Sequence, residues 1–307
     1  MTLRNQDNAY TSFFKGGGFP KFRSKHGQQS FQLPQGMKVD FEGGRVFLPK
    51  LKWVDCVFSR TFEGEIRTVS KSTAGKYFVS LLIDNGKDLP KKKLVDRSLA
   101  VGIDLGIKDF AITSEGEVFP NHRFLSSTLK RLRVEQRSLQ RKQKGSANRE
   151  KQKKVVAKLH EKITNQRKNF LHKVSTAIVK QYDTICLETL NTSGMMKNRK
   201  IARCIGEIGW NDGAARRFNQ MLDYKAEWYG KNLIRIGRFA PSSKICSVCG
   251  WHNKELKLSD RTWTAGRPRC ANDHTVDRDV NAAINIKDFG LSGAARRTQP
   301  LVVNVTH

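Results

Sequence analysis

A pair of cysteines and an acidic cluster stand close together in the last quarter of the chain. Two residues separate Cys246 from Cys249, and Cys270 follows about twenty residues later. Two thiols at this spacing can hold one zinc ion from a tight turn, and a zinc ribbon takes its other ligands from a second turn. Asp277 and Asp279 come soon after, at the predicted start of a helix, and carboxylates suit magnesium. The combination predicts a zinc-stabilised hairpin beside a magnesium site, which indicates nucleic-acid chemistry.

Two further carboxylates end apolar segments that are typical of buried strands. Asp104 ends the segment 99–104, and Glu188 ends the segment 184–188. Carboxylates at the ends of neighbouring strands can converge at one sheet edge, where bound divalent cations would relieve their repulsion and activate water against a phosphodiester. Each residue also has a simpler explanation, because Asp104 could cap a turn, Glu188 could pair with a lysine and Asp279 could cap a helix. Together with the cysteines, the three carboxylates favour a metal site.

The composition favours a polyanionic partner. Lys and Arg number 57 against 28 Asp and Glu, so the formal net charge is +29, and phosphate backbones are the usual partners of such an excess. An anionic membrane surface is the rival interpretation, but we find no apolar stretch of about 18 residues and no signal-peptide pattern, so we expect no membrane partner. Cys56 and Cys186 lie in apolar, strand-like contexts that predict small core residues in a reducing cytosol.

The elements that must position these residues follow from the pattern of apolar side chains. Short apolar segments separated by glycine-containing turns over residues 28–97 predict a small antiparallel sheet or barrel. Residues 125–181 predict two long helices with a turn at 145–148, and the second has an apolar stripe at helical spacing. That stripe consists of Leu159, Ile163, Phe170, Val174 and Ile178. We also expect strands at 99–104, 110–113, 184–188 and 233–236, and helices at 211–230 and 277–289.

Two basic regions are candidate nucleic-acid surfaces. The Gly-rich loop after the first helix alternates aromatic side chains with cations, which suits base stacking and phosphate contacts, although a solvated loop anchored by two phenylalanines would have the same composition. The helices over 125–181 have a basic face that could follow a phosphate backbone or could simply be solvated. The candidate contact residues are Phe19, Lys21, Phe22, Arg23, Lys25, Lys130, Arg131, Arg133, Arg141, Lys142, Arg167 and Lys168.

Six short motifs can be compared with known families. They are Gly102-Ile-Asp104-Leu-Gly-Ile-Lys108, Leu187-Glu188-Thr-Leu-Asn191, Tyr224-Lys-Ala-Glu-Trp-Tyr-Gly230, Pro241-Ser-Ser-Lys244, Cys246-Ser-Val-Cys249-Gly250 and Asp277-Arg-Asp279-Val-Asn281-Ala-Ala-Ile-Asn285. As a set, from about residue 8 to residue 290, the chain resembles TnpB, the OrfB product of IS200/IS605-type transposons, which is related to the type V CRISPR nucleases (Cas12).

The resemblance implies a multidomain α+β and α/β protein in which a β-barrel wedge domain precedes a RuvC-like, RNase H-type nuclease domain. It implies a remnant of a helical recognition segment and a basic loop at 1–27, the wedge domain at 28–97, the nuclease domain at 98–240 and 277–307, and an inserted zinc ribbon at 241–276. The basic helices at 125–181 fall within the nuclease domain.

The resemblance also implies an activity and its partners. The expected function is RNA-guided endonuclease cleavage of double-stranded target DNA, in a prokaryotic cytoplasm associated with the nucleoid. The implied catalytic and magnesium-binding (or manganese-binding) residues are Asp104, Glu188 and Asp279. The implied guide is a structured, transposon-encoded RNA of the omega type, with one protein monomer on each RNA.

Two departures from the family pattern affect these expectations. The expected second Cys-x-x-Cys is replaced by Cys270-Ala-Asn-Asp273-His274, so zinc would be held by Cys246, Cys249, Cys270 and either His274 or Asp273, with His252 a weaker substitute. The family's usual chain also has an N-terminal strand and a helical recognition segment before the point where this sequence starts. The alternative function is therefore an RNA-guided DNA-binding protein or repressor that cuts poorly.

Overall fold

The structure, a computed structural model, describes residues 2–21, 33, 36–63, 65–66, 70–71, 77–84, 86–121, 124–189, 214–237, 240–257, 259–264 and 275–298. The chain divides into two compact units. One consists of Met1–Asp88 with Arg137–Glu161, and the other of Leu89–Gln136 with Lys162–His307.

In the described part of the first unit before residue 89, there are one helix and seven short strands. Helix α1 (Thr2–Phe14) precedes β1 (Lys38–Asp40), β2 (Arg45–Leu48), β3 (Lys52–Asp55), β4 (Glu65–Ile66), β5 (Ser70–Lys71), β6 (Tyr77–Phe78) and β7 (Ile83–Asp84). The strands pair antiparallel as three small sheets, β1-β2-β3, β4-β7 and β5-β6. The antiparallel pairing that we predicted is present, but no closed barrel is formed by the residues that the structure describes. Strands of two to four residues supply too few ladder bonds to close one.

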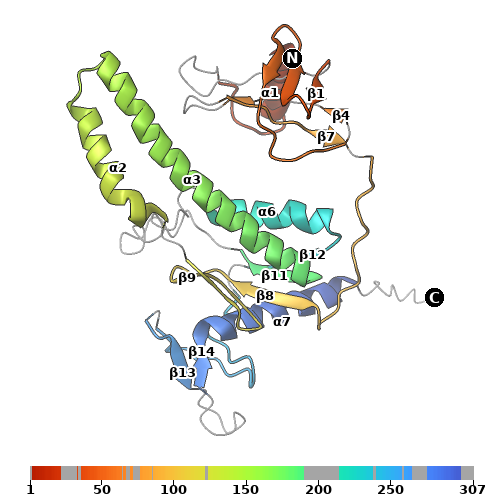
Figure 1. The fold of residues 1–307 in the computed structure, drawn as a ribbon. Helices are drawn as coiled ribbons and strands as arrows, with labels where there is room; N and C mark the ends of the chain where they lie inside the picture. Colours follow the sequence, from red (N-terminus) through yellow and green to blue (C-terminus); the bar gives the residue numbers. More distant parts are fainter. Residues whose placement is uncertain are drawn as a thin grey trace. The chain divides into compact units, whose positions relative to one another are not determined.

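Two long helices follow, as the sequence predicts. Helix α2 (Phe124–Arg141) and helix α3 (Ala147–Gln181) are joined by a short turn, visible in Figure 1. Arg149 Nη1 donates to the carbonyl oxygens of Leu139 and Lys142 at 2.8 Å each, which satisfies carbonyls at the C-terminal end of α2. The predicted stripe of α3 is confirmed, because Leu159, Ile163, Val174 and Ile178 are buried and Phe170 packs against the buried core.

The second unit is built on a mixed five-stranded sheet with the order β10-β9-β8-β11-β12. These strands are β8 (Ala100–Asp104), β9 (Asp109–Thr113), β10 (Val118–Pro120), β11 (Thr184–Glu188) and β12 (Asn232–Ile236). Strands β8, β9 and β10 form an antiparallel meander, whereas β11 pairs parallel to both β8 and β12. The carboxyl ends of β8, β11 and β12 therefore meet at one edge of the sheet.

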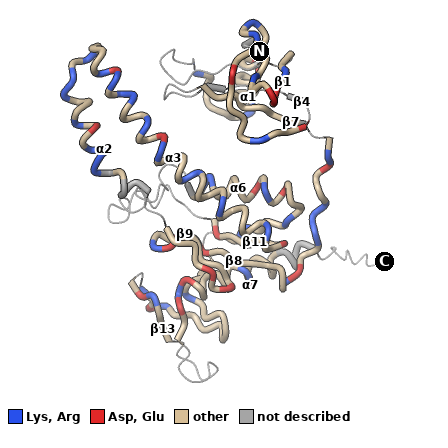
Figure 2. Tube along the Cα trace, in the orientation of Figure 1, with Lys and Arg blue, Asp and Glu red and all other residues tan. Residues whose placement is uncertain are grey.

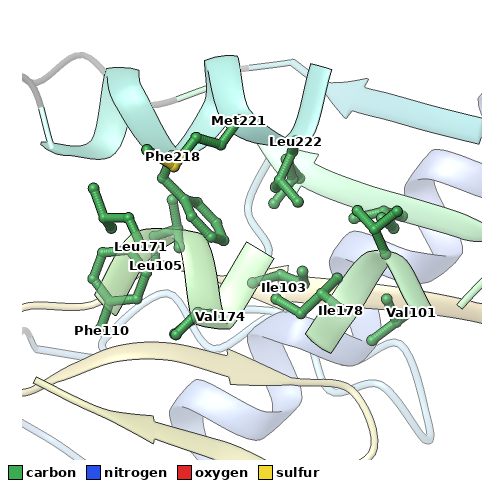
Figure 3. Close-up of a cluster of buried hydrophobic side chains, with 14 of the residues drawn as sticks. Val101, Ile103, Leu105, Phe110, Leu171, Val174, Ile178, Phe218, Met221 and Leu222 are labelled. Atoms are coloured by element: carbon green, nitrogen blue, oxygen red, sulfur yellow. The ribbon is translucent and has the colours of Figure 1, made fainter. Parts of the chain in front are cut away.

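Helices cover both faces of this sheet. The second half of α3 and helix α6 (Ala214–Trp228) pack on one face, where Val101, Ile103, Ile178 and Phe218 belong to one buried cluster (Figure 3). Helix α7 (Arg278–Thr298) packs on the other face and contacts β8 and β11. It extends beyond the 277–289 that we predicted, because the apolar pattern weakens after Phe289 although the backbone remains helical.

Helix α7 approaches β8 closely because position 102 has no side chain. A Cβ atom on Gly102 would overlap the carbonyl oxygen of Ala283 and would lie 2.6 Å from the backbone nitrogen of Lys287. The Ala283 side chain is itself fully buried. Small residues at the crossing thus allow the helix to lie directly on the strand that carries Asp104.

A small two-stranded ribbon of β13 (Thr262–Thr264) and β14 (Thr275–Asp277) leads into α7. Its core contains the buried side chains of Cys246, Trp263 and Val276, with Trp251 packed against them. Within the described segments, none of the helices combines the length and apolar character needed to cross a membrane.

Candidate active site

Strand alternation places Asp104 and Glu188 on the same face of the sheet. Ile103 of β8 is paired in register with Leu187 of β11, so the two carboxylates are the next residues along adjacent parallel strands. Ile103 and Leu187 point into the core on the α3–α6 face. Because side chains alternate along a strand, Asp104 and Glu188 point to the opposite face, which α7 covers. The sequence prediction that these two residues end neighbouring strands is confirmed.

The start of α7 brings the third carboxylate to this edge. Asp277 caps the helix, because its Oδ1 accepts hydrogen bonds from the backbone nitrogens of Asp279 and Val280 at 3.0 Å each. Asp279 lies in the first helical turn, and its side chain is 25% exposed. The capping role that we considered for Asp279 therefore belongs to Asp277.

The three carboxylates interact electrostatically. Burial and then the negative charges of Asp279 and Glu188 raise the pKa of Asp104 from 3.8 to about 7. Burial also raises the pKa of Glu188. The raised pKa of Asp104 indicates that too little water or positive charge is available there to stabilise its ionised form.

Two arginines, one beside the ribbon and one at the start of α7, approach this cluster. The sequence alone predicted no role for either. Arg261 Nη1 lies 3.3 Å from Asp279 Oδ2. The Arg278 backbone nitrogen donates to the Arg261 carbonyl oxygen at 2.8 Å, and its charge slightly offsets the raised pKa of Asp104. The pattern Asp-Arg-Asp at 277–279 is the local signal that could have identified Arg278, whereas Arg261 is 18 residues away from its partner.

The donor set fits a hard divalent cation. Three carboxylates supply only oxygen atoms, and their mutual repulsion is the kind that a bound cation relieves. Among the described residues, no group of three or more His, Cys, Asp and Glu side chains is already arranged as a closed coordination site. The side chains thus share one sheet edge and one electrostatic environment without surrounding a common point.

The two described cysteines of the predicted zinc site lie in a tight turn. We define the cysteine turn as residues 242–250, which includes Cys246 and Cys249. The Cys246 backbone nitrogen donates to the carbonyl oxygen of Trp251 at 2.8 Å, and the Gly250 nitrogen donates to the carbonyl oxygen of Cys246 at 2.9 Å. Neither cysteine is in a disulfide bond, and Cys246 is 1% exposed. The other predicted ligands, Cys270, Asp273 and His274, lie outside the described residues.

The weaker zinc candidate His252 and the two core cysteines are also described. Residue 252 forms a backbone bridge with Ile245 at the base of the cysteine turn. Cys186 is fully buried, and burial raises its pKa to about 12. Cys56 packs against the small core of β2. The predicted core positions of Cys186 and Cys56 are confirmed.

Most described nucleic-acid candidates are exposed, with one exception. Phe19 is 67% exposed and contacts Phe13 edge to face, and Lys21 is also exposed. Lys and Arg positions, blue in Figure 2, recur along α2 and α3. Lys130, Arg131, Arg133, Arg141 and Lys168 are exposed and Lys142 is half-buried, whereas Phe22, Arg23 and Lys25 lie outside the described residues.

Arg167 corrects the prediction for the basic face of α3. It is only 8% exposed, so it does not contribute to a solvent-facing surface. Helical spacing explains the burial, because positions 163, 167, 171 and 174 share one side of the helix, and Ile163, Leu171 and Val174 are all buried. The long apolar stem of arginine can occupy such a position.

Comparison with known proteins supports one family over nearly the whole chain. Residues 80–199 match the OrfB family model of IS605-type elements, described as "Probable transposase", and residues 216–286 match the "Cas12f1-like, TNB domain". A protein of Streptomyces pristinaespiralis, named as a candidate RNA-guided DNA endonuclease, is 37% identical over 302 residues, covering 96% of this chain and 71% of the relative. InsQ of Escherichia coli strain K12, named in the same way, is 33% identical over 305 residues, with 94% and 73% covered.

Among solved structures, the chain is similar to Cas12f1 in its cryo-EM complex with sgRNA and target DNA. The sequence identity is 21% and the TM-score is 0.47, over 72% of this chain and 44% of that chain. On the sequence relatives and the family models, the chain belongs to the TnpB (OrfB) family of IS605-type transposable elements.

Proposed function

We propose that this protein is an RNA-guided DNA endonuclease that hydrolyses phosphodiesters at the sheet edge formed by Asp104, Glu188 and Asp279. The observation that carries the proposal is the placement of Asp104 and Glu188 at the ends of adjacent parallel strands, next to the helix start that carries Asp279. Burial first, and then the charges of Asp279 and Glu188, raise the pKa of Asp104 to about 7 at this position. The relatives in Streptomyces and Escherichia coli are named as candidate RNA-guided DNA endonucleases, which supports the same activity here.

The three carboxylates would act together as ligands for Mg²⁺ or Mn²⁺. When bound, such ions supply Lewis-acid activation of water and stabilise the leaving oxygen of a phosphodiester. The chain's own contribution is placement. Strands β8 and β11 hold Asp104 and Glu188 at adjacent strand ends, and the Asp277 cap fixes the helical turn that carries Asp279.

Two further parts of the chain support a nucleic-acid partner. The net charge of +29 and the exposed cations of α2 and α3 suit a structured guide RNA and its double-stranded DNA target. We also propose that Cys246, Cys249, Cys270 and His274 or Asp273 hold one structural zinc ion, and that residues 28–97 act as a wedge domain. Elemental analysis of Cys246→Ser tests the zinc assignment, since unchanged zinc content would contradict it.

The decisive experiment is metal-dependent cutting of a guide-matched plasmid by the purified protein–RNA complex. Asp104→Asn, Glu188→Gln and Asp279→Asn should each abolish cutting while guide-RNA binding persists, because removing a negative charge does not weaken attraction to RNA. Asp277→Asn is the matched control, because asparagine retains the Oδ1 atom that caps α7. Full activity of Asp104→Asn would refute the active-site assignment. Guided DNA binding without any cutting by the parent protein would instead support the repressor-like alternative.

A further inference from the structure

Two buried asparagines of α7 hold the cysteine turn. Asn281 and Asn285 are one helical turn apart, so they lie on the same side of the helix. They are 1% and 4% exposed. Both lie in the motif Asp277–Asn285, and the sequence alone predicted no role for either.

The side-chain amides of Asn281 and Asn285 form hydrogen bonds with backbone groups of the cysteine turn. Asn285 Nδ2 donates to the carbonyl oxygens of Ser242 at 2.7 Å and Ile245 at 2.6 Å. Asn281 Nδ2 donates to the Ile245 carbonyl oxygen at 2.7 Å, and its Oδ1 accepts from the Ser247 backbone nitrogen at 2.8 Å. Both residues that flank Cys246 in the sequence are therefore tied to α7.

This attachment is selective for asparagine. Asn281 accepts from a backbone N–H through Oδ1 and donates through Nδ2, and Asn285 donates to two carbonyl oxygens. Aspartate would therefore lose the donors, and leucine would lose every one of these hydrogen bonds. Loss of these side chains would leave buried polar groups without the hydrogen bonds that the amides supply. The turn and the helix thus form one hydrogen-bonded unit.

The same helix carries Asp279 two residues before Asn281. Displacement of the cysteine turn would therefore act on the first turn of α7, which has Asp277 as its cap and carries Asp279, whose charge acts on Asp104. We infer that Asn281 and Asn285 are positioning residues that couple the cysteine turn to the carboxylate site, so that the placement of Asp279 depends on the turn. The inference rests on the proposed function for the role of Asp279.

The test compares Asn281→Leu and Asn285→Leu with Asn253→Leu in the full-length protein. Leucine has nearly the shape of asparagine but cannot form these hydrogen bonds. Asn253 is the matched control because it lies near the cysteine turn and its Oδ1 accepts a local bond from the Glu255 nitrogen at 3.2 Å.

The first measurement is the rate at which iodoacetamide modifies Cys246, followed by mass spectrometry of the peptide that contains it. We expect the rate to increase about tenfold in the two α7 variants, because loss of buried hydrogen bonds makes local opening of the turn easier. The control should react at the parent rate. Parent-like protection of Cys246 in both α7 variants would overturn the attachment.

The second measurement is the dissociation constant for Mn²⁺ alone, obtained by electron paramagnetic resonance on RNA-free protein. We expect about tenfold weaker binding in the α7 variants. Changes of this size are typical when a residue that holds a metal ligand in position is replaced, although it does not bind the metal itself. A merely less stable protein would bind fewer ions at an unchanged dissociation constant. Faster Cys246 modification with unchanged Mn²⁺ affinity would overturn the coupling.

Failure of the proposed function would give a different combination of Mn²⁺ binding and plasmid cutting. If the parent protein binds Mn²⁺ but does not cut a guide-matched plasmid, the nuclease proposal fails while the coupling is still supported by the variant affinities. If the parent binds no Mn²⁺, both the metal site and the coupling to it are overturned.

Discussion

The carboxylates at the two ends of the strands in the five-stranded sheet have opposite electrostatic surroundings. At the edge where β11 begins, Asp183 is 7% exposed and is paired with Lys231 and with Lys93, whose Nζ lies 2.9 Å from Asp183 Oδ2. These lysines lower the pKa of Asp183. At the edge where β8 and β11 end, burial and neighbouring carboxylates raise the pKa of Asp104.

The difference separates a structural carboxylate from a functional one. At the N-terminal edge, where β11 begins, the charges are balanced within the chain, because two lysines neutralise one aspartate. The C-terminal edge gathers three carboxylates, and within the described residues Arg261 is the cation that forms an ion pair with one of them. Such an arrangement stabilises the folded chain less than it could, which is typical of a site that completes its charge balance by binding a ligand.

The largest expected effect is the loss of cleavage at the C-terminal edge. Each of Asp104→Asn, Glu188→Gln and Asp279→Asn should lower the cutting rate by at least about 100-fold, and double variants should add little, because the carboxylates act as one unit. Single-turnover cutting of a guide-matched plasmid measures this. Asp183→Asn is the control from the other edge and should cut normally below its melting temperature. Multiplicative losses in the double variants would contradict a shared site.

The second effect concerns the close approach of α7. Gly102→Ala should destabilise the second unit by about 2–4 kcal/mol, because its Cβ would overlap the Ala283 carbonyl and displace the helix. Thermal unfolding of the full chain measures the change. Gly237→Ala provides the comparison, since a Cβ there would meet nothing within 4 Å. Equal stabilities of the two variants would show that α7 does not depend on position 102.

The same substitution should have opposite effects on stability at the two edges. Asp183→Asn should lower the free energy of unfolding by about 2 kcal/mol, because it leaves the buried Lys231 without its charged partner. Asp104→Asn should raise the free energy of unfolding of metal-free protein by about 1–2 kcal/mol, because it removes a charge that its surroundings disfavour. Denaturant unfolding in the presence of a chelator measures both changes in free energy. Changes of the same sign in the two variants would contradict the contrast between the two edges.

The contribution of Asp183 should depend on pH in a defined direction. Its pKa in the folded protein lies below the ordinary value of 3.8, so the folded state binds fewer protons than the unfolded state as the pH falls through that range. The stability that it contributes is therefore present above about pH 4 and is lost at lower pH. The difference in unfolding free energy between the parent and Asp183→Asn should shrink on acidification; a difference that grew instead would reverse the assignment.

The smallest effect is expected at the exposed ion pair of the C-terminal edge. Arg261→Gln should change the free energy of unfolding by less than about 0.5 kcal/mol, because the Arg261 side chain is 54% exposed. Chemical denaturation would detect a larger change. A loss of unfolding free energy as large as that of Asp183→Asn would mean that Arg261 balances the charge of Asp279 as the two lysines balance the charge of Asp183.

The local pattern was sufficient to predict most elements of the second unit. The apolar segments that end in Asp104 and Glu188 are strands, and the apolar stripe from Leu159 to Ile178 is buried in a helix. These predictions succeeded because burial on one side imposes a period of two or 3.6 residues, which is visible in any single sequence. The ends of these apolar segments also predicted that the two carboxylates could converge at one sheet edge.

Other features depend on which element packs against which, and only the tertiary structure decided them. Asp277 rather than Asp279 caps α7, and the asparagines of that helix reach a turn 34 to 43 residues earlier. Lys93 and Asp183 are 90 residues apart. Such contacts leave no local periodicity, because their free energy depends on partners that only folding brings together.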